Sequence, residues 1–132
     1  MARLLNSVSI HSVLGEQAGA QTAVASTGLL TRDCEGVVYI FEFNAIASGG
    51  EAVVSVQDSP DGSTWTSRAE TETYDDNDTR AVRVLDVPVN GVYQRLSIAR
   101  QTANVAITGI RAIMYGSSWA PPMTGGVPKR YY

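Results

Sequence analysis

The chain has 132 residues, a net charge of −3, 44% hydrophobic residues and 17% charged residues. This length suits one domain, and the hydrophobic fraction excludes wholesale disorder. An acidic chain lacks the basic face that phosphate neutralisation requires, so nucleic-acid binding is disfavoured as the main function. One cysteine excludes an intrachain disulfide, and one histidine leaves little room for a His-rich metal site. No apolar run approaches the ~20 residues of a membrane span, and we expect neither membrane insertion nor a signal peptide.

The N-terminal quarter of the chain contains weak signals. Residues 1–14 alternate loosely, with Val8 and Ile10 on one side and His11 on the other, which predicts a first strand or an extended arm. We interpret His11 as a surface or interface residue. The small and polar residues 15–28 predict a loop, with a short helix as the alternative.

The strongest strand signal covers residues 37–47. Alternate residues from Val37 onward form a continuous apolar face, whereas the opposite face is half apolar. β-Branched and aromatic residues in this period predict a central strand that is buried on one side and partly covered on the other. A glycine turn at 48–50 leads to a second alternating strand over 51–57.

The segment Ser59-Pro-Asp-Gly-Ser-Thr-Trp65 predicts a hairpin. Pro60 presets φ for a turn, and Asp61-Gly62 can supply the positive-φ positions. We expect the Asp61 carboxylate to accept hydrogen bonds from its own turn and the Trp65 ring to pack beneath it.

The following elements complete an all-β pattern. We expect a strand over 64–70, an exposed acidic loop over 71–79 and a strand over 80–89. The apolar face of that strand changes side after its second valine, which predicts a bulge. The dipeptide at 90–91 is Asn-Gly, the strongest hairpin signal in the chain.

The last strands and the C-terminus complete the domain prediction. Apolar alternation continues over 92–98, and a final strand over 104–115 contains Gly109, which predicts another bulge. Six to eight strands joined by hairpin signals, without an amphipathic helix, predict an antiparallel β-sandwich or jelly roll. We expect the sandwich domain over 15–115. Residues 116–132, rich in Pro and Gly, predict an extended C-terminal arm.

No residue pattern predicts catalysis or a cofactor. The acidic residues near 72–78, with Asp58 and Asp61, could offer oxygens to Ca²⁺, but the spacing is not that of an EF-hand loop. We interpret them as a solvated loop. Cys34 lies in no catalytic signature and is interpreted as a buried or idle thiol. The sequence therefore predicts no enzyme, no metal site and no cofactor.

Residue bias suggests protein–protein contacts. Arginine outnumbers lysine nine to one, which is typical of interfaces but also of a GC-rich genome, and both explanations remain open. The C-terminal arm carries large aromatic and basic residues that a solvated tail does not need. Its predicted interface residues are Trp119, Arg130, Tyr131 and Tyr132.

The segment Val-Ser-Val-Gln-Asp-Ser-Pro-Asp-Gly-Ser-Thr-Trp, residues 54–65, resembles hairpins in small structural proteins of tailed-bacteriophage virions, most closely the capsid decoration (cement) proteins. The resemblance implies a jelly-roll or sandwich fold that binds the major capsid protein on the outside of the shell, often as a trimer. It also implies a virion location after synthesis in the host cytoplasm. Residues 1–14 and 116–132 would then be arms that reach across capsomer boundaries, with avidity supplying retention.

Two alternatives remain open. A carbohydrate-binding or tail-fibre module would use a row of exposed rings, for which Trp65, Tyr74, Tyr93 and Trp119 are the candidates. A head–tail connector or tail-completion protein would form rings of six or twelve copies.

Overall fold

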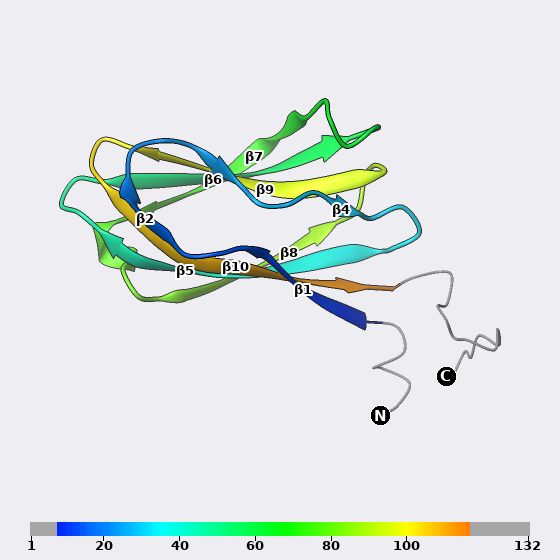
Figure 1. The fold of residues 1–132 in the computed structure, drawn as a ribbon, viewed down its shortest axis with the longest axis horizontal. Helices are drawn as coiled ribbons and strands as arrows, with labels where there is room; N and C mark the ends of the chain where they lie inside the picture. The colour runs from blue at the N-terminus through cyan, green and yellow to red at the C-terminus, as the bar shows by residue number, and fades with distance from the viewer. Residues whose placement is uncertain (1–7, 117–132) are drawn as a thin grey trace.

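The computed structural model describes residues 8–116 of the chain, and residues 1–7 and 117–132 lie outside the described part. The described residues form two antiparallel sheets stacked as layers (Figure 1). The strands are β1 (Val8–Leu14), β2 (Gln17–Ala20), β3 (Val24–Ala25), β4 (Leu29–Leu30), β5 (Gly36–Ile46), β6 (Glu51–Ser59), β7 (Thr66–Asp75), β8 (Val82–Pro88), β9 (Tyr93–Gln101) and β10 (Val105–Tyr115), with a 3-10 turn, η1 (Asp76–Asp78), between β7 and β8. Nothing in the described part is an apolar helix long enough to span a bilayer.

The strand order is that of a jelly roll. Sheet A runs β1-β10-β5-β8, with β2 also paired to β10, and sheet B runs β3-β9-β6-β7, with β4 also paired to β9. The β6–β7 connection is a hairpin within one sheet, whereas β5–β6, β7–β8, β8–β9 and β9–β10 each cross from one sheet to the other. The expected antiparallel sandwich or jelly roll is therefore confirmed.

The core lies between the two sheets and follows the predicted alternation. Tyr39, Phe41 and Phe43 of β5 are at most 2% exposed and face Leu96 and Ile98 of β9 across the layer. The Tyr39 hydroxyl donates to Gln94 Oε1 at 2.9 Å, so this buried polar pair is satisfied. Burial raises the pKa of Tyr39 above its usual range.

Residues 15–28 differ from their predicted loop. They contain β2 and β3, which pair with β10 and β9. Buried Arg100 anchors this segment by donating to the Ala18 carbonyl, to the Thr22 carbonyl and hydroxyl, and to the Val105 carbonyl. Burial lowers the pKa of Arg100. Tertiary contacts thus give order to a stretch whose own composition favours a loop.

Two predictions between β7 and β8 are wrong. Residues 71–75 were expected to be loop, but they continue β7 because they pair with residues 51–55 of β6. β8 contains no bulge, since it pairs with β5 in unbroken register from Val82 to Pro88. Its apolar residues change side because those at 82 and 84 face outward and those at 85 and 87 face the core.

The predictions at the other turns and at the first strand have mixed outcomes. The Asn-Gly dipeptide at 90–91 is not a hairpin, since it joins β8 of sheet A to β9 of sheet B. The bulge at Gly109 is confirmed by a register shift against β5 and by φ of 155°. For residues 8–14 the first-strand alternative holds, because they form β1 at the edge of sheet A.

Candidate protein–protein interface

The outer face of sheet A, the side turned away from the core, carries a continuous set of aliphatic residues. Strand register places Ile10, Ile113 and Val38 side by side in one row, and Ile40 beside Val84 in the next. We call this set the apolar face. Its members are Ile10, Val38, Ile40, Val82, Val84 and Ile113.

The apolar face is accessible in the described structure. Ile10, Val82 and Val84 are 66%, 59% and 65% exposed, and they are three of the four large hydrophobic residues that the structure describes as exposed. An antiparallel sheet with one solvated side usually alternates apolar and polar residues. Exposed aliphatic residues on β1 and β8, with half-buried aliphatic residues of β10 and β5 between them, favour a surface that another molecule covers.

A shallow groove of about 280 Å³ lies in this surface. The bulge at Gly109 helps to form it, because the strand bends there against the end of β1. A Cβ atom at this position would lie 3.1 Å from the Leu14 carbonyl oxygen. Ile40 and Val82 give the groove apolar walls, while Glu42 and Arg111 supply both signs of charge. Such a groove fits side chains of a protein partner.

Polar groups border the apolar face at the end where β10 stops. The Tyr115 hydroxyl donates to Asp86 Oδ1 at 2.7 Å across the outer face of β5. This hydrogen bond raises the pKa of Tyr115. An apolar centre with a polar border is the usual arrangement of a protein interface.

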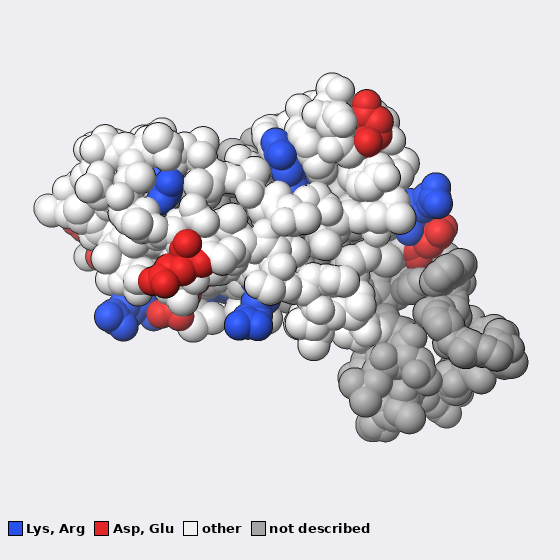
Figure 2. All heavy atoms as spheres, viewed as in Figure 1, with Lys and Arg blue, Asp and Glu red and all other residues white. Residues whose placement is uncertain are grey.

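Elsewhere the charged groups are dispersed. Figure 2 shows one side of the molecule, on which acidic and basic side chains are few and lie close to one another in places, so neither sign of charge forms a large patch. The outer face of sheet B is more mixed, since Ser55 and Ser97 are paired there and Gln57 accepts from Arg95 at 2.6 Å, beside Val53 and exposed Leu30. The contrast singles out sheet A as the candidate interface.

The predicted structural hairpin forms at its predicted place. Asp61 Oδ1 accepts from the amides of Ser63 and Thr64 at 2.8 and 2.9 Å, and Gly62 has φ of 81°. These hydrogen bonds lower the pKa of Asp61. The side chain therefore shapes its own turn, as the sequence indicated.

Trp65 lies differently from its prediction. Its ring edge contacts Gly28, where a Cβ atom would come within 2.9 Å, and the Arg95 guanidinium lies 4.3 Å from its centroid. The ring beside Gly62 is that of Tyr93. Local spacing placed Trp65 under its own hairpin, but packing between strands of sheet B decides which ring lies there.

Two of the three candidate stacking rings in the described part of the chain, Tyr74 and Trp65, are engaged in contacts within the protein. Tyr74 is half-buried and packs against Phe41 and Phe43, with centroids 5.8 and 5.4 Å apart. Arg95 covers the Trp65 ring, as described above. Trp119 lies outside the described residues.

The acidic residues are used in local structure. Asp75 and Asp78 form a capping box around η1, and Asp76 accepts from the Gly49 amide at 3.2 Å. Asp78 also pairs with Arg83. Within residues 8–116 no group of three His, Cys, Asp or Glu side chains is arranged to hold a metal ion.

Cys34 and His11 show no sign of chemistry. Cys34 is half-buried in a turn in which its amide donates to Thr31, and burial together with Asp33 raises the pKa of its thiol. A raised pKa disfavours the nucleophilic thiolate. His11 is exposed on β1 and lies 3.1 Å from Ser9 Oγ.

The remaining predicted interface residues, Trp119, Arg130, Tyr131 and Tyr132, all lie outside the described part of the chain. Sequence reasoning missed the apolar face. Two sequence features could have revealed it. One is the set of apolar residues on the second face of residues 37–47, such as Val38 and Ile40. The other is the pair of valines at 82 and 84, which were attributed to a bulge.

No family model and no curated protein matches this chain. Among solved structures, it is similar to a chain of the Bacillus endospore appendages, described as a novel family of disulfide-linked pili, with a TM-score of 0.50 and 16% identity over 85% of this chain and 90% of that one. It also matches the Eiger TNF of S. frugiperda (TM-score 0.40, 8% identity, 83% and 97% covered) and the infectious bursal disease virus Gt strain (TM-score 0.39, 7% identity, 86% and 33% covered). At these identities the likeness is one of fold alone, and none of the three is described as a phage decoration protein.

Proposed function

We propose that this chain is a structural subunit that works by binding other protein subunits through the apolar face of sheet A. The observation that carries the proposal is that three of the four exposed large hydrophobic residues in the described part of the chain lie on sheet A, whose outer face is richer in aliphatic residues than that of sheet B. Exposed valines stabilise a solvated sheet only slightly, whereas a subunit also buries them in contacts. The appendage chain of similar fold, described as part of a pilus, is consistent with an assembling subunit.

The finer form of the proposal is a capsid decoration protein. The resemblance of residues 54–65 to decoration-protein hairpins supports this form. In it, the chain forms a trimer on the outside of a phage shell and contacts the major capsid protein. Each contact can be weak, because a trimer engages several sites together.

The test combines mass measurement with co-sedimentation on assembled, expanded phage shells. We expect the wild type to sediment as a trimer of the 14.1 kDa chain and to pellet with shells. The variant Val82→Lys/Val84→Lys should bind shells about tenfold more weakly, because it places two charges on exposed β8 positions of the apolar face. Both positions are exposed, so the variant should remain folded.

The matched control is Thr71→Lys/Thr73→Lys, which adds the same charge to exposed positions of sheet B. It should bind as the wild type does. Equal loss in both variants would show that charge alone matters and would contradict the assignment of the face. A ring of six or twelve copies would instead favour the head–tail connector alternative. A monomer that does not pellet with shells would overturn the decoration proposal.

A further inference from the structure

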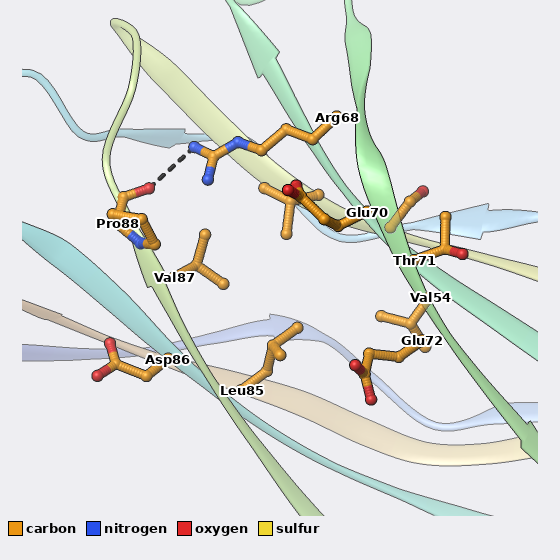
Figure 3. Close-up of a pocket in the computed structure, with 11 residues that line it drawn as sticks. Val54, Arg68, Glu70, Thr71, Glu72, Leu85, Asp86, Val87 and Pro88 are labelled. Atoms are coloured by element: carbon orange, nitrogen blue, oxygen red, sulfur yellow. Dashed lines mark hydrogen bonds between the residues drawn. The ribbon is translucent and has the colours of Figure 1, made fainter.

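A second surface feature lies between the two sheets, at the open side of the sandwich. β7 is the last strand of sheet B and β8 the last strand of sheet A, and the two are not hydrogen-bonded to each other as strands. A cavity of about 170 Å³ lies between them. Val54 of β6 and Leu85 and Val87 of β8 supply its apolar floor (Figure 3). The space is below the size of a cofactor pocket and suits one or two side chains.

The rim of this cleft is acidic. Glu70 and Glu72 are two residues apart on β7, so they share a face, and Glu72 is paired with buried Val54. Their carboxylates therefore lie on the core side of an edge strand, and Figure 3 shows both directed toward the cavity. In the described part of the chain, no cationic side chain lies within ion-pair distance of either one.

The nearby arginine is already engaged. Arg68 makes two hydrogen bonds with the Asp58 carboxylate, at 2.7 and 2.9 Å, and donates to the Pro88 carbonyl at 2.9 Å. The last bond links β7 to β8 and closes one end of the cleft, as the dashed line in Figure 3 shows. The cleft thus combines an apolar floor with two carboxylates that lack a described counter-ion.

Such a cleft fits an extended segment that carries a cation next to an aromatic ring. The chain has one segment of this kind outside the described residues, Lys129-Arg-Tyr-Tyr132, which includes its single lysine. Alternate residues of an extended segment share a face. Either face therefore presents one cation with one ring: Lys129 with Tyr131, or Arg130 with Tyr132.

The segment can reach the cleft of its own molecule. Tyr115 at the end of β10 is paired with Gly36 of β5, which is paired with Pro88 of β8. The end of β10 is thus two strand spacings, about 10 Å, from the closed end of the cleft. Residues 117–128 can span about 40 Å when extended, which is well above the distance of about 10 Å that they must cover to reach the cleft. Attachment also gives the segment a local concentration of the order of millimolar.

We propose that residues 129–132 bind in the β7–β8 cleft of the same molecule, with one cation on Glu70 and Glu72 and one tyrosine ring on the apolar floor. This assignment does not depend on the proposed function. Inward charges on an edge strand also prevent pairing with foreign strands, and the experiment distinguishes that role from binding.

The first measurement is limited trypsin digestion of the full chain, followed by mass spectrometry of cleavage at Lys129 and Arg130. Bound residues are protected in proportion to the bound fraction. The variant Glu70→Gln/Glu72→Gln should release the C-terminal residues about tenfold faster. The control Glu16→Gln/Asp33→Asn makes the same change in net charge at exposed sites and should be cleaved as the wild type is. If the Glu70→Gln/Glu72→Gln variant is cleaved as the wild type is, the proposal is overturned. The two glutamates would then serve only to prevent pairing of β7 with foreign strands.

The second measurement decides whether binding is within one molecule. In a Cys34→Ser background, Glu72→Cys combined with Lys129→Cys should form a disulfide within the monomer under mild oxidation. Thr73→Cys with Lys129→Cys is the matched control, since Thr73 is exposed on the opposite face of β7. It should not cross-link. A disulfide-linked dimer, or equal cross-linking in the control, would contradict the proposal.

Discussion

The two outer faces of this sandwich surround the same core but differ in how much aliphatic surface they expose. On sheet A, Val82 and Val84 of β8 are exposed beside isoleucines of β5 and β10. On sheet B, Gln57 donates to Ser67 Oγ at 3.0 Å and accepts from Arg95. A core needs only one apolar side of each strand. Under the proposed function, the second apolar side of sheet A is the surface that binds other subunits.

The largest expected effect concerns the bulge at Gly109 of β10, which helps to form the groove on sheet A. The corresponding central strand of sheet B, β9, pairs with β6 without a bulge. Gly109→Ala should lower the free energy of unfolding by about 2 kcal/mol, because its φ of 155° disfavours an L side chain and the new methyl group would crowd the Leu14 carbonyl. Urea unfolding measures this change.

Gly15→Ala is the control for that measurement. Gly15 also lines the groove, and a Cβ atom there would meet nothing within 4 Å. Its stability should stay within about 0.5 kcal/mol of the wild type. If both variants unfold alike, the bulge is not a constrained feature of sheet A.

A smaller effect is expected from making the two faces alike. Ser55→Val/Ser97→Val adds a β-branched pair at directly opposed positions on the outer face of sheet B. This pair should raise the free energy of unfolding by about 0.5–1 kcal/mol, since such cross-strand pairs stabilise sheets. Thermal unfolding measures the gain.

The same double variant tests whether apolar surface alone is enough for binding. If the apolar face is a specific interface, the new valines on sheet B should leave the co-sedimentation with shells unchanged. Stronger binding would show that any aliphatic patch attracts the shell, and the distinction between the faces would fail.

The sequence predicted the features that depend on residues close together in the chain, and it missed those that depend on contacts between distant strands. The alternation of residues 37–47 is local, and it correctly predicted the central strand and its buried face. The turn at Asp61 was also predictable, because its hydrogen bonds run to amides two and three residues away. Asn90-Gly91 misled the prediction because a hairpin dipeptide does not reveal whether the next strand joins the same sheet.

The apolar face itself needed tertiary information. A regular β8 with outward valines and a bulged β8 with inward valines have the same sequence pattern. Only the unbroken register with β5 distinguishes them. The sequence pointed instead to Trp119, Arg130, Tyr131 and Tyr132, which lie outside the described part of the chain.

The smallest expected effect is the pH dependence of the sheet B hairpin. The amides of Thr64 and Ser63 lower the pKa of Asp61 below its usual range. A carboxyl group whose pKa is lower in the folded state stabilises the fold above its unfolded pKa, about 3.9, and this contribution is lost as the pH falls through the folded pKa. Asp61→Asn keeps an oxygen acceptor but removes the charge. The variant should therefore melt at a lower temperature than the wild type near pH 6, and this gap should narrow as the pH falls below about 3.9. The control Asp33→Asn makes the same change in net charge at another exposed site and should melt close to the wild type near pH 6. If the difference in melting temperature between Asp61→Asn and the wild type grows as the pH falls, the ionised carboxylate does not stabilise the turn. The hairpin of sheet B would then not depend on this charged side chain.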